Sequence, residues 1–474
     1  MPFNTYTFIA FFIIVLIIHY SLRDWKTQKI NLLVVSYIFY SAWNPIFVFL
    51  LIISTICDWI VAKRIYSSHT QKSKTRYLML SLVINLGLLG YFKYGAFWLD
   101  NTIHLLSTVG IIFQPASFDI ILPVGISFYT FQTLSYSLDV YRGKLKPGNS
   151  LLDYALYVSF FPQLVAGPIV RAGDFLPQCE KPRRASQDQL GWGLSLLTIG
   201  LFMKIILADT LFAPVVDKVY DNPEQFNNLE TWTAILSFSG QIFCDFAGYS
   251  TCAIGIALCL GFVLPDNFKA PYAALGFKDF WQRWHISLSS WFRDYVYISL
   301  GGNRISVTRT HLNVMITMLI AGLWHGASWM FVLWGGLHGF YLLIENKIRT
   351  YYHGDAKLSW VTQLALIILT YLIVSLTWIL FRAENLNDAA IILSHLYSSS
   401  SHPNRMILSF FEINMALLAS FVLLTWHIYQ RDKSIEHFYN RIHPVFRGVF
   451  LFAQLLIIYL FASGDDHAFI YFQF

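Results

Sequence analysis

The sequence predicts an all-α protein that crosses a membrane many times. Of its 474 residues, 56% are hydrophobic and only 13% are charged, and the mean hydropathy is +0.52. A soluble globular chain carries about 25% charged residues. Apolar runs follow one another along the chain, and a helix of about 20 apolar residues can cross a bilayer. We therefore expect one integral-membrane domain over residues 1–474, with about eleven or twelve membrane-spanning helices.

No soluble domain of ordinary size fits between these runs. In chain order the apolar runs cover residues 6–22, 31–44, 46–62, 77–98, 119–137, 151–170, 190–212, 231–263, 310–345, 359–381, 408–429 and 445–463.

The distribution of charge predicts the orientation in the membrane. Residues 63–76 contain five basic residues and no acidic one, and residues 430–447 add four more basic residues. Short cytoplasmic loops carry the excess of Lys and Arg, so both segments should be cytoplasmic. Residues 209–230 contain five acidic residues against one lysine, which suits the opposite side. Alternation from these anchors places both termini outside the cytoplasm.

The run 151–170 is expected to enter the membrane and return on the same side. Basic segments flank it at residues 142–146 and 171–184, and it contains Pro162 and Gly167. If both flanks are cytoplasmic, the run must be re-entrant, and such segments occur in folds that build an internal cavity.

The net charge of +6 follows the membrane topology and does not indicate a nucleic-acid partner. Membrane lipids with anionic headgroups, or an anionic cosubstrate from the cytosol, are the partners that this charge favours. The five cysteines show no CxxC spacing, so neither a disulfide framework nor a metal site is expected.

A polar stripe interrupts the apolar run 231–263. Gln241, Asp245 and Tyr249 recur at intervals of four residues, which places them on one face of a helix. Polar side chains at this depth must face protein or a cavity. The stripe could line a substrate channel or bridge neighbouring helices.

Charged and aromatic residues alternate in the segment 267–304, which therefore cannot be an ordinary membrane span. Its basic residues would line a surface that faces the cytoplasm, while its tryptophans insert at the interface or wall a pocket. A basic surface with an aromatic-lined pocket suits a phosphorylated carrier such as coenzyme A. An interfacial helix anchored by Trp and Arg would have the same composition. The candidate donor-binding residues of this segment are Asn267, Arg283, Trp284, Arg293 and Arg304.

The run 310–345 carries the candidate catalytic residue, His325. As one helix its 36 residues would reach roughly 54 Å, well beyond a hydrocarbon core of about 30 Å, so the run must break. Gly322 and Gly326 flank the Trp324–His325 pair and tolerate the backbone angles of a break. An ionisable residue at such depth is a functional candidate by default. The alternative is a packing histidine bonded to a neighbouring carbonyl.

A second histidine, His285, follows Trp284 in the segment 267–304. It could pass a proton to His325 or orient it, or it could bond the backbone of a re-entrant segment. The sequence contains no GxSxG, HExxH, Walker or GxGxxG motif. Imidazole is then the remaining catalytic group, and near neutral pH it can take a proton from an attacking hydroxyl.

From about residue 30 to the carboxyl end, the chain resembles the membrane-bound O-acyltransferase family. The residues that carry the resemblance are LPVGISFYTFQTLSYSLDVYRG (122–143), FFPQLVAGPIVR (160–171), FWQRWHISLSSWFRDYVYISLGGNR (280–304), AGLWHGASWMFVLWGGLHG (321–339) and LTWILFRAENLNDA (376–389). The pairing of RWHISLS with LWHGASW is the most specific part of the match. Within the family the chain is most similar to the bacterial branch that acetylates alginate and peptidoglycan or transfers D-alanine to teichoic acids.

The resemblance implies a ring of tilted helices around a central tunnel, with the two family histidines matching His325 and His285. It implies transfer of an acyl group, most often acetyl, from cytosolic acetyl-CoA or a carrier-protein thioester, with no bound cofactor. His325 would be the general base on the attacking hydroxyl, or would carry the acyl group itself. The acceptor would be a secreted polysaccharide such as alginate, peptidoglycan or cellulose.

By analogy with two-part relays, the resemblance also implies an extracytoplasmic acetyltransferase partner with a serine nucleophile, and a bacterial inner-membrane location. Three alternative functions compete with this one. A transporter of polysaccharide, lipid or protons would use broken helices and a midplane histidine without covalent chemistry. A scaffold for polysaccharide export would leave the buried histidine unexplained, and acylation of protein or lipid with long chains is possible within the same family.

Overall fold

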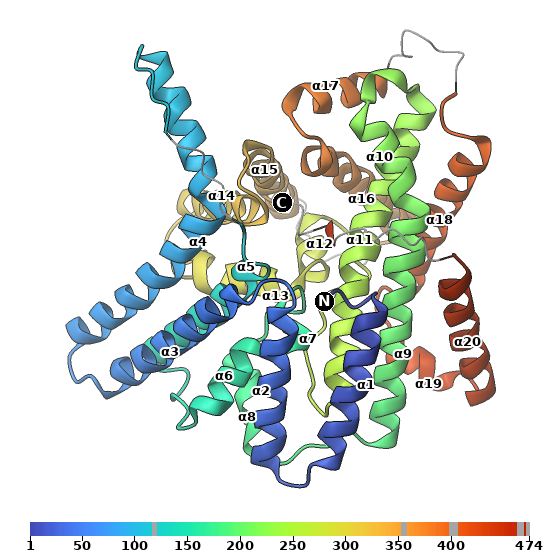
Figure 1. Cartoon of the computed structure of the whole chain (residues 1–474). Helices are drawn as coiled ribbons and strands as arrows, with labels where there is room; N and C mark the ends of the chain where they lie inside the picture. The colour runs from blue at the N-terminus through green and yellow to red at the C-terminus, as the bar shows by residue number, and fades with distance from the viewer. Residues whose placement is uncertain (116–120, 352–357, 398–405, 462–468, 471–474) are drawn as a thin grey trace. The chain divides into compact units, whose positions relative to one another are not determined.

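The computed structural model describes residues 1–115, 121–351, 358–397, 406–461 and 469–470 (Figure 1). Every regular element within these ranges is a helix, which confirms the all-α prediction. Each apolar run coincides with one or more helices. The start of the run 119–137, the end of the run 445–463 and the carboxyl terminus lie outside the described residues.

Within the described part of the chain, seven helical segments are long and apolar enough to cross a membrane, fewer than the eleven or twelve expected. The difference arises because several apolar runs are short or divided; for example, the first helix has 16 residues. The seven segments are Ile46–Ser67, Gln71–Thr108, Gln187–Asp221, Asn228–Cys259, Trp360–Arg382, Phe410–Gln430 and Pro444–Phe461.

The chain folds as two compact units. We call residues 1–193, 256–265 and 326–328 the N-terminal unit, and residues 194–255, 266–325 and 329–474 the C-terminal unit. All the candidate site residues predicted from the sequence belong to the C-terminal unit.

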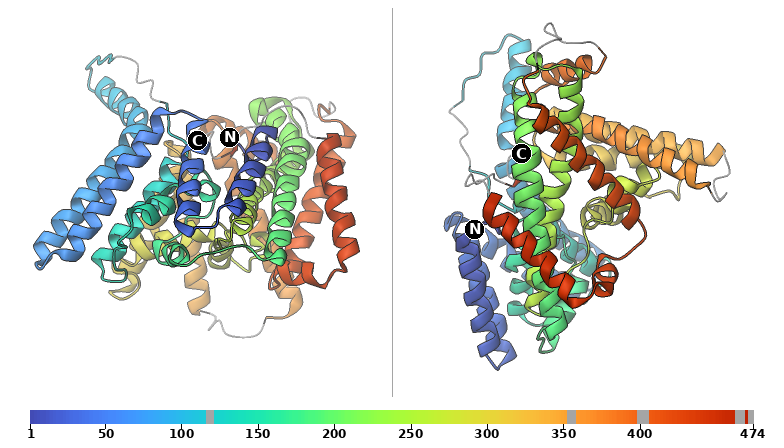
Figure 2. Two further views of the ribbon diagram at one scale, coloured as in Figure 1. Left: turned by 60° about the horizontal axis from the view of Figure 1, so that its bottom comes forward. Right: turned by 90° about the vertical axis from the view of Figure 1, so that its right-hand side faces the viewer.

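The N-terminal unit is built from helical pairs. The α1 and α2 helices form a hairpin, and α3 packs along α4 (Figure 2). The helices of this unit are α1 (Tyr6–Ser21), α2 (Trp25–Ser41), α3 (Ile46–Ser67), α4 (Gln71–Thr108), α5 (Ile126–Tyr141), α6 (Leu151–Ser159), α7 (Phe161–Leu164) and α8 (Ala172–Glu180).

A buried polar network joins α3, α4 and α5. The Asp58 carboxylate accepts hydrogen bonds from Ser81 Oγ at 2.5 Å, Asn85 Nδ2 at 2.8 Å and Ser137 Oγ at 3.3 Å. All four side chains are buried. A buried charge is tolerable only when such donors replace its water, so the network fixes how these three helices pack.

The run expected to be re-entrant does not form one long helix. It is divided into the nine residues of α6 and the four of α7, and the chain turns at Phe160. Nine residues rise only about 14 Å, which is too short to cross the hydrocarbon core. This length suits a segment that enters and returns.

The C-terminal unit contains the remaining helices. The first residues of α9 and the last residues of α11 belong to the N-terminal unit. The remaining helices are α9 (Gln187–Phe202), the π-helix η1 (Met203–Phe212), α10 (Ala213–Asp221), η2 (Pro223–Gln225), α11 (Asn228–Cys259), η3 (Pro271–Ala273), α12 (Phe277–Arg283), α13 (Ile286–Trp291), the π-helix η4 (Phe292–Tyr297), α14 (Val307–His325), α15 (Trp329–Tyr351), α16 (Trp360–Arg382), α17 (Leu386–His395), α18 (Phe410–Gln430), α19 (Ile435–Arg441) and α20 (Pro444–Phe461).

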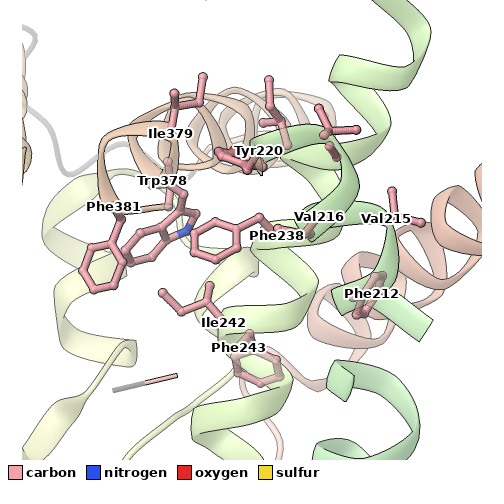
Figure 3. Packing of buried hydrophobic residues seen from close by; sticks show 14 of the residues in the cluster. Phe212, Val215, Val216, Tyr220, Phe238, Ile242, Phe243, Trp378, Ile379 and Phe381 are labelled. Carbon is pink, nitrogen blue, oxygen red and sulfur yellow. The ribbon is translucent and has the colours of Figure 1, made fainter. Parts of the chain in front are cut away.

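An aromatic core holds the C-terminal unit together. Trp378 and Phe381 of α16 pack with Phe238 and Ile242 of α11 (Figure 3). Trp378 is completely buried and Phe381 is 2% exposed. Large aromatic side chains dominate the energetics of such cores, so the positions of α11 and α16 are well defined around the elements described next.

Candidate active site

The α14 and α15 helices form a closely packed hairpin that positions His325. The α14 helix ends at His325, and after three intervening residues α15 begins at Trp329. Where the two helices face each other, a methyl group added to Gly322 would lie 2.2 Å from the Phe331 carbonyl oxygen. A methyl group on Gly335 would lie 2.3 Å from the Met318 carbonyl oxygen. Only glycine permits this approach of the two backbones.

His325 is almost completely buried, with 3% of its surface exposed, and aromatic rings surround it. Its ring centroid lies 5.1 Å from that of Trp324, 5.1 Å from that of Trp334 and 5.3 Å from that of Phe381. The corresponding interplanar angles are 81°, 87° and 69°. The imidazole therefore sits at the carboxyl end of a helix and within an apolar enclosure.

His285 occupies a strained backbone position next to the same tryptophan. Its φ angle is 43°, in the left-handed region that a residue other than glycine rarely adopts. The His285 ring is completely buried. Its centroid lies 4.6 Å from that of the Phe246 ring and 5.9 Å from that of the Trp324 ring. Since Trp324 also contacts His325, one indole joins the two histidines that the sequence pointed to.

Asn267 fixes the orientation of His285. Its Oδ1 accepts the backbone N–H of Ser287 at 3.3 Å and the Ser287 hydroxyl at 2.8 Å. Because a backbone N–H can only donate, this side of the amide is the oxygen, and the His285 Nδ1 that lies 3.1 Å from it is a donor. In the neutral ring Nε2 is then the acceptor nitrogen.

Backbone pairing brings Asn267 to His285. The N–H of Ile286 donates to the Asn267 carbonyl at 2.9 Å, and the N–H of Lys269 donates to the Arg283 carbonyl at 2.9 Å. The short segment after α11 thus pairs with the junction of α12 and α13. Interleaved charges and aromatics in the sequence indicated an unusual segment here, but they did not indicate this pairing.

Among the predicted donor-binding residues, Arg283 is already engaged within the protein. Its Nε lies 2.7 Å from Asp279 and its Nη2 lies 3.1 Å from Asp432, and only 11% of the side chain is exposed. Arg431 adds a second cation at 2.7 Å from Asp279. Burial would raise the pKa of Asp279, but hydrogen bonds from the Leu275 N–H, Arg283 and Arg431 hold it below its usual value.

The other predicted donor-binding residues differ in exposure. The Arg293 side chain is 64% exposed and lies 2.7 Å from Asp294, and Arg304 is also exposed. Trp284 is completely buried and packs on Trp378 at 5.1 Å. Arg293 and Arg304 are thus exposed cations, of which Arg293 is paired with Asp294, while Trp284 belongs to the core.

The polar stripe of α11 participates in a buried charge cluster. Lys204 of η1 is in contact with Asp245 and lies 2.8 Å from Asp209. The second Asp245 oxygen accepts the N–H of Ile470 at 2.9 Å. These contacts support the bridging alternative for Asp245. They also correct the prediction for Asp209, which lies inside a π-helix, 7% exposed, and not in an acidic connection.

The two other members of the stripe lie in different surroundings. Tyr249 is buried, with its ring 5.0 Å from that of Phe469, whereas Gln241 is partly exposed. Sequence reasoning missed Lys204, although a single lysine within the apolar run 190–212 was a usable signal. It gave no role to Trp334 and Phe381, although both lie in segments quoted for the family resemblance, because their type and position are those of ordinary core residues.

Comparison with known proteins identifies relatives over most of the chain. The family model of the membrane-bound O-acyltransferases matches residues 148–382. A protein of Azotobacter vinelandii named as a probable alginate O-acetylase is 36% identical over 436 residues, which cover 91% of this chain and 85% of the relative. A Pseudomonas aeruginosa protein of the same name is 36% identical over 451 residues, 93% of this chain and 83% of the relative. The peptidoglycan O-acetyltransferase of Helicobacter pylori is 36% identical over 394 residues, 77% of this chain and 73% of the relative.

Proposed function

Because the chain belongs to the membrane-bound O-acyltransferase family, we propose that it moves an acetyl group from a cytosolic thioester to a hydroxyl, for O-acetylation of a polysaccharide outside the cytoplasm. His325 is the general base of this reaction. The observation that carries the proposal is the buried imidazole at the end of α14, in a hairpin that close glycine contacts hold in place.

The chemistry requires one proton to move twice. His325 takes the proton of the acceptor hydroxyl while the hydroxyl oxygen attacks the thioester carbonyl, which gives a tetrahedral intermediate. Collapse of this intermediate breaks the carbon–sulfur bond, and the leaving thiolate takes the proton from the imidazolium. A positioned base of this kind contributes about 10²- to 10⁴-fold to the rate. Burial supports this role because it keeps the thioester apart from bulk water.

His285 acts as a positioning residue in this scheme. Its ring contacts Trp324, which also contacts His325, and Asn267 fixes its tautomer. The strained φ angle of His285 is a cost of about 1–3 kcal/mol that such a role would justify.

The donor is acetyl-CoA or a carrier-protein thioester, a cosubstrate that enters from the cytoplasmic side. The exposed cations Arg293 and Arg304 are the residues suited to its phosphates. Arg283 instead pairs with Asp279 within α12 and links this helix to Asp432, just beyond the end of α18.

The acceptor class is a secreted glycan, since the relatives are named for alginate and peptidoglycan. Because the chain shows no hydrolase-like nucleophile motif, a separate extracytoplasmic acetyltransferase with a serine nucleophile completes the transfer. The protein lies in the bacterial inner membrane with both termini outside the cytoplasm, the orientation that the basic segment 63–76 favours.

The test is acetyl transfer by the purified protein in lipid nanodiscs. The assay contains radiolabelled acetyl-CoA or an acetylated carrier protein, oligosaccharides of alginate, peptidoglycan or cellulose, and the extracytoplasmic acetyltransferase partner. Variants His325→Ala and His285→Ala are compared with wild type. His427→Asn is the matched control, because His427 is buried in the same unit, and asparagine can replace its Nδ1 as acceptor of the Tyr272 N–H. Thermal unfolding checks that each variant is folded.

Loss of at least about 100-fold in turnover in His325→Ala, with His427→Asn near wild type, supports the general-base role. Labelled acetyl that remains on wild-type protein through denaturation, and maps to His325, would replace that role with an acyl-imidazole. Folded His325→Ala that transfers acetyl at the wild-type rate would overturn the proposal.

A further inference from the structure

We propose that Trp334 and Phe381, together with Trp324, form an aromatic cage that stabilises the imidazolium of His325 during acyl transfer. This inference rests on the proposed role of His325 as general base. Trp334 and Phe381 are positioning residues, because they act on the reaction through His325. Trp334 lies nine residues after His325, and Phe381 lies in the segment 376–389 that carries the family resemblance.

The three rings come from three successive helices and meet the imidazole nearly at right angles. Trp324 belongs to α14, Trp334 to α15 and Phe381 to α16. Their centroids lie 5.1 to 5.3 Å from that of His325, at interplanar angles between 69° and 87°. In a perpendicular contact, the positive edge of one ring meets the negative face of the other. The imidazolium edge carries the N–H groups, so wherever this edge faces one of the three rings, the contact attracts it as a cation–π interaction does.

Burial makes this attraction important. Trp334 is completely buried, and Phe381, His325 and Trp324 are 2%, 3% and 4% exposed. Removing water penalises a newly formed charge, while cation–π contacts strengthen when the cation is desolvated. An imidazolium formed here must therefore be stabilised by the protein itself.

The end of α14 supplies a second favourable interaction. His325 is the last residue of this helix, where the carbonyl groups carry partial negative charge. A cation at such a position is stabilised, and the effect is largest in partly buried geometry. The helix end and the cage thus favour the same protonation state, the one that exists between attack and release of the thiolate.

The cage is rigid because its members are fixed from outside. The Trp334 ring stacks on that of Trp378 with centroids 5.4 Å apart and an interplanar angle of 18°, and the Trp281 ring lies 5.7 Å from the Trp334 ring. Phe381 packs on Trp378 at 5.2 Å, and Figure 3 shows these two side chains side by side. Gly335, next to Trp334, lets α15 pack closely against α14. The rings therefore cost no reorganisation when the charge forms.

The experiment replaces Trp334 site-specifically with tryptophan carrying one, two, three or four fluorine atoms in the full-length protein in nanodiscs. Fluorine weakens the negative ring face with little change in shape. The same series at Trp378 is the matched control: among the described residues it contacts Trp284, Trp334, His338 and Phe381. The kcat for acetyl transfer is measured with KM for acetyl-CoA, alongside His325→Ala.

A stepwise fall in kcat of about 2- to 30-fold across the Trp334 series is expected, the range that a cation–π contact of ordinary strength gives. KM should stay constant, and the Trp378 series should be flat. The cage would be overturned if kcat stays constant or rises across the Trp334 series, or if it falls equally in the Trp334 and Trp378 series. In either case turnover that still depends on His325 would leave the proposed function standing. Wild-type transfer by folded His325→Ala would instead remove the proposed function and this inference with it.

Discussion

Replacing Gly335 with alanine should slow acetyl transfer while leaving the protein folded. The added methyl carbon would lie 2.3 Å from the Met318 carbonyl oxygen, against about 3.5 Å for an unstrained contact. The helices α14 and α15 must then separate locally by roughly 1 Å. This displacement falls between Trp334 and His325, which the hairpin holds at 5.1 Å. A misplacement of about 1 Å can cost about 100-fold in rate, whereas overpacking costs about 1–3 kcal/mol in stability.

The matched control is the adjacent Gly336→Ala. A methyl group there would lie 3.5 Å from the Leu319 side chain, an ordinary contact, so its kcat should stay near wild type. Both variants are assayed for kcat and KM in nanodiscs, and thermal unfolding measures their stability. If Gly335→Ala and Gly336→Ala have equal kcat values, the hairpin spacing does not govern the geometry of His325, and the reasoning is refuted.

Three further changes follow from the contacts of the C-terminal unit. Asn267→Ala removes the acceptor of His285 Nδ1 and should lower kcat about 10- to 100-fold. Asn267→Asp keeps an acceptor and should lose less. Equal losses of kcat in the two variants would contradict the orienting role of Asn267. Lys204→Met leaves buried carboxylates without their cation and should destabilise the fold by about 3–5 kcal/mol in denaturation experiments, and adding Asp245→Asn should recover part of this loss. The pKa of Asp279 is depressed in the folded state, so the contribution of this carboxylate to stability is complete above about pH 4 and is lost as the pH falls further. The melting temperature of wild type should therefore drop more between pH 6 and pH 3 than that of Asp279→Asn.

The fold class was predictable because a chain with so few charged residues has no soluble alternative. The number of spans was not, because an apolar run does not reveal how much of it forms one long helix. The breaks expected in the runs 151–170 and 310–345 are present, at Phe160 and after His325, but the sequence did not show that other runs form short helices such as the 16 residues of α1. Asp209 was misplaced for a related reason, since its partner Lys204 lies five residues earlier on a π-helix whose geometry the sequence does not announce.

The candidate site was predictable only where a residue is anomalous in its own surroundings. His325 and His285 stood out as ionisable residues beside tryptophan in apolar or aromatic segments, and the structure places both against Trp324. Trp334 and Phe381 could not be recognised, because an aromatic residue in an apolar helix is the ordinary case. Their proposed role depends on which helices meet, and the close approach of Gly322 to Gly335, which lie 13 residues apart in the sequence, allows α14 and α15 to meet.

The charge cluster of Lys204 and Asp245 shows how membrane-buried charges can serve geometry at a distance from the chemistry. Burying such groups is costly, and apolar side chains of similar size would often be at least as stable. Asp245 precedes Phe246, whose ring lies 4.6 Å from that of His285. The ion pair ties η1 to α11 at this level, and therefore fixes the surface on which His285 rests. Conformational specificity next to His285 is thus the advantage that offsets the cost of these charges.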